Sequence, residues 1–415
     1  MRNTHARNAI RYYVAIAMIL LFLFVSNDFG MIDVQKTAIV TAAGIDREED
    51  TFIVTSQIAV PQSSKQGEAS KSVQLVSRGK TVAEAFEEIN AKTGWYPKLV
   101  FCNLIVLGEN TVKDNAFDAL DFFLRDEYLS DNCLVATCDG TAKDLLNTAA
   151  LIDPSSSQAI GKILSEHAER VGTVLPSSLR EFAIGYFSES ASGFLPILKI
   201  EQQQETKNGS SNNQSSSSNN ASSSSENSAS SGNTSSSGGK SSENSNNQPV
   251  FSASETALFV KGRRVETLTK EETFATGATL NKLRLASYPV SNSKETCTLT
   301  VKRNDPKTYL TVTDGNSALH IEITLSAGVL DYSKAQNLEN FTDAGNVSKE
   351  FFRLAETKLT GELYRVYEKC RACGCDLFGV RERLIKYEKK EFHKKEHSIF
   401  QNTDAVVSVR FQNVR

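Results

Sequence analysis

The stretch Ile32-Asp-Val-Gln-Lys-Thr-Ala-Ile-Val-Thr-Ala-Ala-Gly-Ile-Asp46 decides how the chain begins to fold. A short acidic turn follows it, and then the run Thr51-Phe-Ile-Val-Thr-Ser-Gln-Ile-Ala-Val60. In that run successive side chains face opposite ways, with the period of two expected for a strand. The turn at residues 46–50 is too charged to bury. The two runs therefore predict a β-hairpin just outside a membrane segment.

Residues 1–30, upstream of the hairpin, are predicted to be a signal or membrane-anchor segment. Arg2, Arg7 and Arg11 precede an uninterrupted apolar run at residues 12–25, and no acid occurs before Asp28. This run is shorter than the roughly 20 residues that span a bilayer and is typical of a signal peptide. No Ala-x-Ala-like cleavage pattern follows it. We therefore expect the segment to be retained as a short anchor, with the arginines inside.

Residues 31–200 alternate between predicted helices and strands, as in a mixed α/β region. Thr81-Val-Ala-Glu84 is a capping box that begins a helix ending by Gly94. The nearly continuous apolar run at residues 99–107 predicts a central strand that is covered on both faces. The further elements expected here are a strand at residues 133–138 and helices at residues 112–124, 157–171 and 178–187.

Residues 201–250 are of low complexity and consist mainly of Ser, Asn and Gly. Such a composition cannot bury enough apolar surface to offset the entropy of the chain. We therefore predict a disordered Ser/Asn-rich linker or loop insertion. It divides the chain into two halves.

Residues 251–415 begin with a predicted hairpin around Lys261-Gly262-Arg263, and Thr269-Lys-Glu-Glu272 is a capping box for the helix after it. Strand candidates at residues 296–303, 308–313 and 318–324 suggest an antiparallel meander with one wet face.

A long helix at residues 348–373 and a last strand at residues 405–411 complete this α+β domain. We expect Leu359, Leu363, Val366 and Phe378 to anchor the helix on the sheet. The whole chain is therefore expected to be α+β, or mixed α/β, and to consist of several small sheet-plus-helix domains.

The charge balance does not indicate a nucleic-acid partner. Lys plus Arg number 46 and Asp plus Glu number 49, which gives a net charge of −3. This is too balanced for binding through counterion release. The sequence has no nucleophile elbow and no phosphate loop, and His167 and His320 are interpreted as solvated side chains. We assign no catalytic, cofactor-binding or metal-ligating residue and expect no cofactor.

One cluster has the ligand types of structural zinc, namely Cys370-Arg-Ala-Cys373-Gly-Cys375 with His393-Lys-Lys-Glu-His397. Thiolates and imidazoles at such offsets can converge tetrahedrally. The histidines also suit the wet face of a helix, and Gly374 suits a left-handed helix end. Seven cysteines also allow a disulfide outside the cytoplasm. A zinc site, a disulfide and ordinary packing are therefore all open for this cluster.

The motif Ala38-Ile-Val-Thr-Ala-Ala-Gly-Ile-Asp46 also resembles the start of the Ger(x)C family, the C subunits of bacterial spore germinant receptors. Further stretches fit the family in order: Gly79-Lys-Thr-Val-Ala-Glu-Ala-Phe86 with Gly108-Glu109 beyond it, Phe122-Phe-Leu-Arg-Asp126, and Asp376-Leu-Phe-Gly379. The resemblance spans nearly all of the chain outside the insertion.

The leader departs from the pattern of this family. Ger(x)C proteins typically end their leader in a lipobox whose cysteine is lipidated, whereas the first cysteine of this chain is Cys102. The family's cysteine would fall near Asn27 or Asp28, so lipidation at that point is excluded. An uncleaved helix would hold the chain at the membrane instead.

The resemblance implies a non-enzymatic, membrane-anchored subunit of a nutrient germinant receptor that acts in spore germination. The implied partners are the integral membrane A and B subunits and the inner spore membrane, on whose outer face the chain would lie. Because the resemblance carries no catalytic residue, the matching positions are interpreted as fold determinants: Gly79, Lys80, Thr81, Gly108, Glu109, Arg125, Asp126, Asp376, Phe378 and Gly379. The alternatives are an exported metal-dependent hydrolase that uses the cysteine and histidine cluster, and a surface adhesin.

Overall fold

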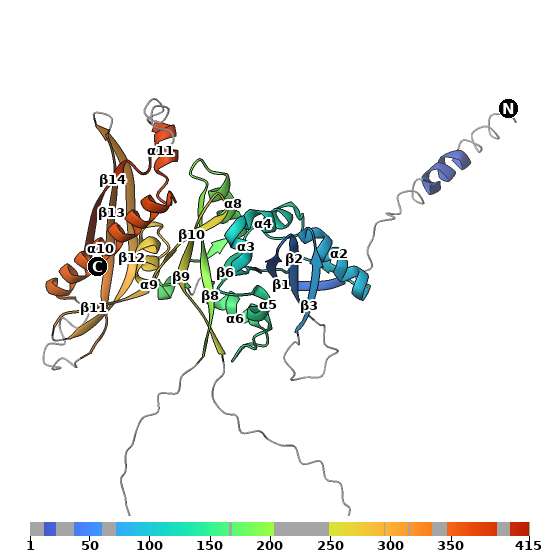
Figure 1. Cartoon of the computed structure of the whole chain (residues 1–415), viewed down its shortest axis with the longest axis horizontal. Coiled ribbons are helices and arrows are strands. Elements are labelled where there is room, and N and C mark those ends of the chain that lie inside the picture. The colour runs from blue at the N-terminus through green and yellow to red at the C-terminus, as the bar shows by residue number, and fades with distance from the viewer. Residues whose placement is uncertain are drawn as a thin grey trace, which may run out of the picture.

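The computed structural model describes residues 12–21, 37–59, 72–165, 168–202, 249–293, 295–313, 316–333, 347–387 and 399–414. Two β-sheets lie side by side, each with its own helices (Figure 1). The fold is mixed α and β, as the sequence predicted.

Only part of the predicted leader is described. Residues 12–21 are helical with exposed side chains, and residues 1–11 and 22–30 lie outside the described part of the chain. Among the helices that are described, none combines the length and the apolar character needed to cross a membrane.

The predicted N-terminal hairpin is confirmed and lies next to the edge strand β3 of the first sheet. β1 (Thr37–Glu48) and β2 (Thr51–Ala59) pair antiparallel, with Glu48 opposite Thr51. β3 (Ser72–Gly79) pairs with the other side of β2. The tight turn therefore contains only residues 49 and 50.

The centre of the first sheet is parallel. β5 (Leu104–Leu107) lies between β1 and β6 (Leu134–Cys138) and runs parallel to both. β8 (Ser192–Gln202) pairs in parallel with the other side of β6. Two short strands, β4 (Tyr96–Lys98) and β7 (Ser177–Ser178), pair with β1 and β6.

A hairpin from beyond the insertion completes the first sheet. β9 (Pro249–Val260) pairs antiparallel with β8, and β10 (Arg263–Leu268) pairs with β9. The predicted turn is confirmed at Lys261 and Gly262, both of which take positive φ. Because Gln202 pairs with Pro249, residues 203–248, which lie outside the described part, connect two neighbouring strands of one sheet.

Helices cover both faces of the first sheet. In β5, Ile105 and Leu107 belong to one hydrophobic core, whereas Leu104 and Val106 belong to another. The first core includes residues of α2 (Val82–Thr93), α3 (Glu109–Asp114), α4 (Ala116–Arg125) and α8 (Leu179–Phe187). The second includes residues of α5 (Ala142–Asn147) and α6 (Ser156–Ile163). A central strand buried on both faces therefore shows no polar alternation.

The second sheet has the order β11 (Ala286–Ser291), β12 (Thr296–Thr313), β13 (Asn316–Tyr332) and β14 (Thr403–Asn413). The first three strands are antiparallel, and β14 runs parallel to β13. Burial alternates along these strands, so one face is packed and the other meets solvent.

The long helix α10 (Lys349–Cys373) packs against β14, and α9 (Lys270–Thr279) packs against α10. The Oη of Tyr367, a fully buried side chain, donates a hydrogen bond to the carbonyl of Thr403 at 2.8 Å. All four predicted anchors are buried in the core shared with β13 and β14: Leu359, Leu363, Val366 and Phe378. The packing of the long helix predicted from the sequence is confirmed.

The predicted strand at residues 99–107 is wrong in its first half. The strand begins at Leu104, and residues 99–103 form a turn and its flanks. In this turn Leu99 and Cys102 are buried, whereas Val100 and Phe101 are exposed. An apolar run alone cannot distinguish a strand from a turn that is fixed by two buried side chains.

Two of the expected helices are each split in the structure. The helix expected at residues 112–124 is split into α3 and α4 at Asn115, whose side chain accepts a hydrogen bond from the Phe117 N–H at 3.1 Å. The helix expected at residues 157–171 is likewise split into α6 and α7 (Ala168–Val171).

The two strands expected at residues 296–303 and 308–313 are a single strand, β12. Pro306 does not interrupt this strand. β11 pairs only with residues 296–301, so among the described strands the part of β12 that contains Pro306 pairs with β13 alone. A proline, which lacks an N–H group, is tolerated in such an edge position.

Candidate functional site

The cysteines near residue 370 lie where the two sheets meet. Cys370 is buried in the last turn of α10, and Gly374 ends that helix in the left-handed conformation at φ 76°, donating to the Cys370 carbonyl. This is the helix end that the Gly374 pattern suggested. Cys375 is buried, and its Sγ lies 3.5 Å from the carbonyl oxygen of Phe259 in β9. Cys375 therefore packs the end of the long helix against the first sheet.

The structure does not assemble a metal centre from the residues that it describes. All seven cysteines are described, and each is a free thiol. No group of three or more His, Cys, Asp or Glu side chains within the described residues is arranged to hold a metal ion. His393 and His397 lie outside these residues, as does His167. His320 is on β13, where its ring stacks on Tyr309 with centroids 4.7 Å apart.

Asp376 organises the segment after the cysteines. Its carboxylate accepts hydrogen bonds from the N–H groups of Val380 at 3.0 Å and Arg381 at 2.8 Å, at the start of α11 (Val380–Tyr387). Its own N–H donates to Ser192 Oγ of β8 at 2.9 Å. Burial raises the pKa of the Asp376 carboxyl, and the backbone N–H bonds oppose that rise. Asp376 therefore caps one helix and ties it to the first sheet.

Asp46 likewise caps a helix, from a position on β1 in the first sheet. Its carboxylate accepts from the N–H groups of Ala142 at 2.7 Å and Lys143 at 2.9 Å, at the start of α5. Burial raises the pKa of this carboxyl as well. A Cβ at Gly108 would lie 1.9 Å from the Asp46 Oδ1. The Gly-Ile-Asp stretch and the Gly108-Glu109 stretch therefore meet at one buried carboxylate.

Asp46 corrects one inference from the sequence. Residues 46–50 were expected to be too charged to bury, yet Asp46 is only 8 % exposed and belongs to β1. The physical reason is that two N–H groups at a helix start replace its lost hydration. The N–H groups come from residues almost one hundred positions later, so nearby sequence contained no signal for this contact.

Other matching positions also serve the fold. A Cβ at Gly79 would lie 2.5 Å from the backbone nitrogen of Ala85, so glycine lets β3 approach the start of α2. Thr81 caps α2 by accepting from the Glu84 N–H at 3.1 Å. Arg125 pairs with the Asp121 carboxylate at 2.7 Å, within α4.

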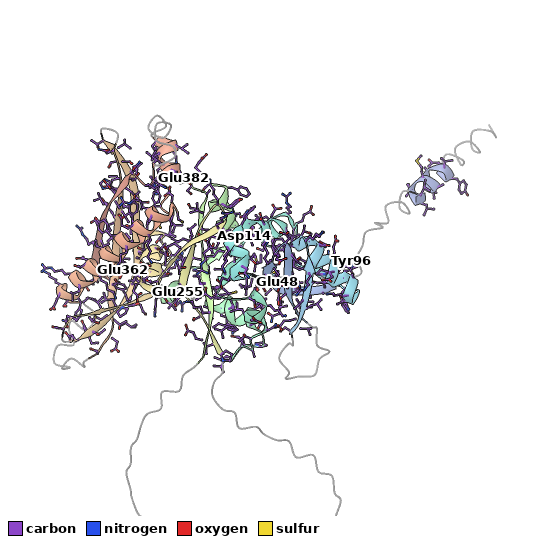
Figure 2. The ribbon with its side chains drawn as sticks, viewed as in Figure 1. Glu48, Tyr96, Asp114, Glu255, Glu362 and Glu382 are labelled. Carbon is purple, nitrogen blue, oxygen red and sulfur yellow. The ribbon has the colours of Figure 1, made fainter. Side chains whose placement is uncertain are left out.

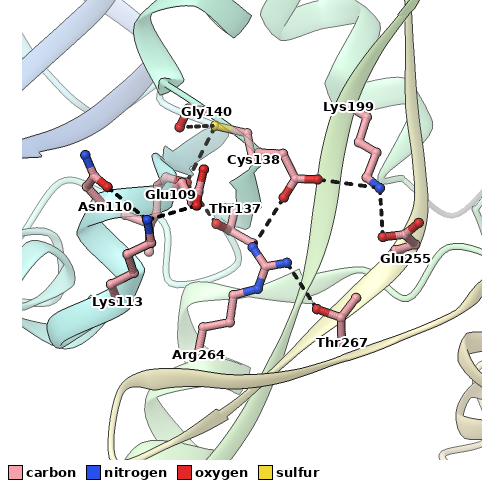
Figure 3. A network of polar contacts seen from close by, with 12 residues as sticks. Glu109, Asn110, Lys113, Thr137, Cys138, Gly140, Lys199, Glu255, Arg264 and Thr267 are labelled. Atoms are coloured by element: carbon pink, nitrogen blue, oxygen red, sulfur yellow. Dashed lines mark hydrogen bonds and ion pairs between the residues drawn. The ribbon is translucent and has the colours of Figure 1, made fainter.

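A charged groove of about 470 Å³ lies at the ends of β5 and β6, and Glu109, another of the matching positions, lines it. Figure 3 shows its contacts. Glu109 pairs with Lys113 at 2.9 Å, and this contact lowers the pKa of the Glu109 carboxyl. Asp139 lies 3.3 Å from the guanidinium of Arg264 and 3.5 Å from the ammonium of Lys199.

The charges of this groove satisfy one another. Lys199 also pairs with Glu255 at 2.8 Å, a contact that raises the pKa of the lysine. The neighbouring Cys138 is fully buried, and burial raises the pKa of its thiol. A neutral buried thiol is a poor nucleophile. The arrangement can hold β8, β9 and β10 to the centre of the sheet, and it offers no activated base or nucleophile among these side chains.

A second cavity, of about 310 Å³, lies at the junction of the two sheets. It is bounded by α8, the start of β8 and the Asp376 segment. The Oε1 of Glu382 accepts a hydrogen bond from the Ser190 N–H at 3.0 Å, while its Oε2 has no hydrogen-bond partner among the described residues. Figure 2 labels Glu382 on the α11 side of this junction. Three carboxyl side chains, of Glu181, Asp376 and Glu382, line the cavity.

Long-range ion pairs reinforce the junction. Lys369 of α10 donates to the Glu272 carboxylate at 2.8 Å and to the Thr267 carbonyl at 3.2 Å. Lys282 donates to the Pro176 carbonyl at 3.0 Å and pairs with Glu181 of α8. These hydrogen bonds and ion pairs link the helices next to the second sheet to the first sheet and its helices.

Comparisons with known proteins cover both parts of the molecule. A family model described as "Spore germination protein N-terminal domain" matches residues 30–200, and one described as "Spore germination B3/ GerAC like, C-terminal" matches residues 254–414. No curated protein matches the chain. The solved structure "Crystal Structure of the GerBC protein" aligns over 90% of this chain and 97% of its own, with 16% sequence identity and a TM-score of 0.50. That structural likeness shows a shared fold.

Proposed function

The chain belongs to the Ger(x)C family of GerAC-like spore germination proteins, and from this premise we propose that it is a membrane-tethered, non-enzymatic subunit of a nutrient germinant receptor. Its role lies in spore germination. The observation that carries the proposal is that the two family regions together cover almost all of the chain outside the insertion.

The geometry of the site supports a structural role for the family motifs. Asp46 and Asp376 each cap a helix through two backbone N–H groups. Glu109 is paired with Lys113. These hydrogen bonds and this ion pair stabilise the fold. A catalytic side chain must instead be within reach of a substrate atom. We therefore assign these residues no reaction.

The proposed setting is the outer face of the inner spore membrane. The apolar segment at residues 12–25, with its three preceding arginines, would tether the chain there. No cysteine is present at the usual lipobox position, so the tether would be the peptide segment itself. The proposed partners are the two integral membrane subunits, A and B. The domain division proposed from the sequence is 31–200 and 251–415, separated by the insertion at 201–250.

The test is a gene deletion in the spore-forming host. Spores that lack the chain should fail to germinate with nutrients, measured as the fall in optical density, yet should germinate normally by a treatment that bypasses nutrient receptors. The full chain should restore the nutrient response. Normal nutrient germination of the deletion strain, in a host with no second copy of the receptor, would contradict the proposal.

A matched pair of variants tests the tether. The chain without residues 2–25 should be made at normal levels, be recovered in the soluble fraction of the spore, and fail to restore germination. The same chain with an unrelated single-span anchor in place of residues 2–25 should restore it. If the untethered chain restores germination fully, membrane attachment is not part of the function.

A further inference from the structure

Five large apolar side chains are exposed on β3 and on the segment from the end of α2 to the turn after β4, at the end of the first sheet where β1 begins. Their exposed fractions are 47% for Val73, 47% for Trp95, 41% for Tyr96, 48% for Val100 and 62% for Phe101. We call this set the aromatic end. Single exposed apolar residues are ordinary, but a contiguous group of them marks a surface that contacts another apolar phase.

Strand pairing and a shared groove place Tyr96, Trp95 and Val73 beside the first residues of β1. Tyr96 is opposite Thr37 in the parallel pairing of β4 with β1. Trp95 and Val73 line a groove of about 240 Å³ together with Thr37 and other residues of β1 and β2. Figure 2 labels Tyr96 at the end of the first sheet that is farthest from the second sheet.

The aromatic end is fixed by its backbone and by buried neighbours. Val100 and Phe101 lie between Leu99, which is 3% exposed, and Cys102, which is 2% exposed. The Cys102 N–H donates to the Leu99 carbonyl at 2.8 Å and so closes the turn. The two buried side chains hold the turn from both ends, so the exposure of Val100 and Phe101 is a built feature of the fold.

Trp95 is fixed in the same manner. The helix α2 ends at Gly94, which has φ 72° and donates to the Asn90 carbonyl. The Trp95 N–H then donates to Thr93 Oγ1 at 3.1 Å. The left-handed residue turns the chain directly from the helix into β4, and this places the indole in the groove beside the start of β1.

The position of this surface in the chain indicates what covers it. Eleven residues, 26–36, separate the apolar run at residues 12–25 from the first residue of β1. A fully extended chain of that length spans at most about 36–40 Å. The aromatic end therefore stays within that distance of the point where the proposed tether meets the lipid.

The chemistry of the aromatic end suits a bilayer interface. Trp and Tyr are enriched at the level of lipid headgroups, because their rings are apolar and their N–H and O–H groups reach water. The nearby cations are already engaged: Lys92 pairs with Glu88 at 3.0 Å, and Lys98 lies 4.7 Å from the centre of the Tyr128 ring. Docking would thus be driven by apolar burial, with little dependence on anionic lipid.

We propose that the aromatic end lies in the headgroup region of the membrane to which the chain is tethered, so that the first sheet stands on the bilayer and the second sheet points away from it. The inference rests on the proposed membrane tether. It adds a defined orientation for the folded part, which a tether alone would leave undetermined.

Trp95 is the single tryptophan of the sequence, so its fluorescence reports on this surface alone. The full chain is reconstituted in neutral phosphatidylcholine vesicles with and without bromine on the acyl chains near the headgroup. Docking predicts a blue-shifted emission and strong quenching by the shallow bromines, unchanged when salt or anionic lipid is added. An unshifted emission that bromine does not quench would overturn the proposal.

A relocated tryptophan provides the matched control. In the double variant Trp95→Phe/Tyr387→Trp the indole lies at the end of α11, where Tyr387 is 68% exposed. Its emission should be insensitive to brominated lipid. Equal quenching of both proteins would mean that the whole chain lies on the bilayer without a preferred face, which also overturns the proposal.

A surface variant that leaves the reporter in place tests the contact itself. Val100→Ser/Phe101→Ser should retain the thermal melt of the parent and lose most of the quenching of Trp95. Unchanged quenching in this variant contradicts the assigned surface. A blue shift without quenching by bromine, or one that grows with protein concentration, would instead place residues 26–36 or a second copy of the chain on the groove.

Flotation of the same vesicles separates this proposal from the proposed tether. If the chain floats with the vesicles and Trp95 is not quenched, the tether stands and the docked orientation is wrong. If the chain does not float, the tether itself is wrong.

Discussion

The first sheet is covered by helices on both faces, whereas the second is covered on one. In β5, Leu104, Ile105, Val106 and Leu107 are all fully buried. In β14, burial alternates between half-buried and exposed positions, and Val406 is 45% exposed. The difference shows that one chain uses a doubly covered sheet with a parallel centre near the proposed tether and a sheet with an open face farther away.

The two sheets consequently depend on different contacts. The first is held by two cores on opposite faces and by several helices. The core of the second lies under α9 and α10 on a single face. We expect the second sheet to be more sensitive to the loss of one element, and each of the following experiments tests or refines this comparison.

Removal of β14 should have the largest effect. Truncation before Thr403 removes Phe411 and the carbonyl that accepts from Tyr367, and it exposes the inner edge of β13. We expect loss of cooperative unfolding of the second sheet, which is an effect of more than about 5 kcal/mol, the low end of the stability of a domain. Limited proteolysis and a thermal melt measure it. Truncation after Asn413 is the control, and equal melts for both would disprove the claim.

The second largest effect should come from substitutions in β5, and a substitution in β14 provides the comparison. Leu104→Ala and Ile105→Ala should each cost about 2–5 kcal/mol, because each leaves a cavity, one on either side of the sheet. In β14, Val406→Ser should lie within about 0.5 kcal/mol of the parent, because its side chain is on the wet face. Denaturant unfolding gives the free energies. A small cost at either β5 position would mean that this face is not a packed core.

The buried carboxyls should give a smaller, pH-dependent effect. Burial raises the pKa of Asp46 and of Asp376 above the usual value of about 3.9. The folded chain then binds more protons than the unfolded chain, so stability falls as the pH rises from about 4 through the raised values.

Asp46→Asn and Asp376→Asn test the two carboxyls separately. Each variant loses one acceptor and should be less stable by about 1–3 kcal/mol. The fall in melting temperature through this pH window should also become shallower in each variant. An unchanged pH profile would show that the carboxyl does not titrate in the window.

Shortening the insertion should have the smallest effect. Deletion of residues 214–236 halves the segment between the paired residues Gln202 and Pro249. The change in loop-closure free energy is about 0.6 kcal/mol for a factor of two in length. The thermal melts of the two chains should be nearly the same. Loss of cooperative unfolding on deletion would mean that the segment contributes to the folded structure.

Local patterns predicted much of this fold. The hairpin of β1 and β2, the caps at Thr81 and Thr269 and the long helix α10 all follow from side chains close in sequence. Thr269 and Glu272 form the complete reciprocal capping box. Each of these elements is marked by a residue pattern or spacing among residues that are close in sequence, so it can be predicted from the sequence alone.

Contacts between distant segments were not predictable in this way. The run at residues 99–107 is apolar except at Asn103, yet Val100 and Phe101 are exposed because Leu99 and Cys102 on either side of them are buried in the first core. The burial of Asp46 depends on the start of α5. The addition of β9 and β10 to the first sheet depends on pairing across the insertion. Each of these features requires knowledge of which segments meet in space.

The pairing of β8 with β9 also bears on how the polypeptide could be divided. Ten register pairs, from Ser192 with Val260 to Gln202 with Pro249, join the strands on either side of the insertion. Covalent continuity at this place therefore adds little to the contacts that already hold the two strands together. Two separately made fragments, 1–202 and 249–415, would carry complementary strand edges. The insertion is therefore a suitable position at which to split the protein for a reporter assay, or at which a gene fission could divide it into two chains.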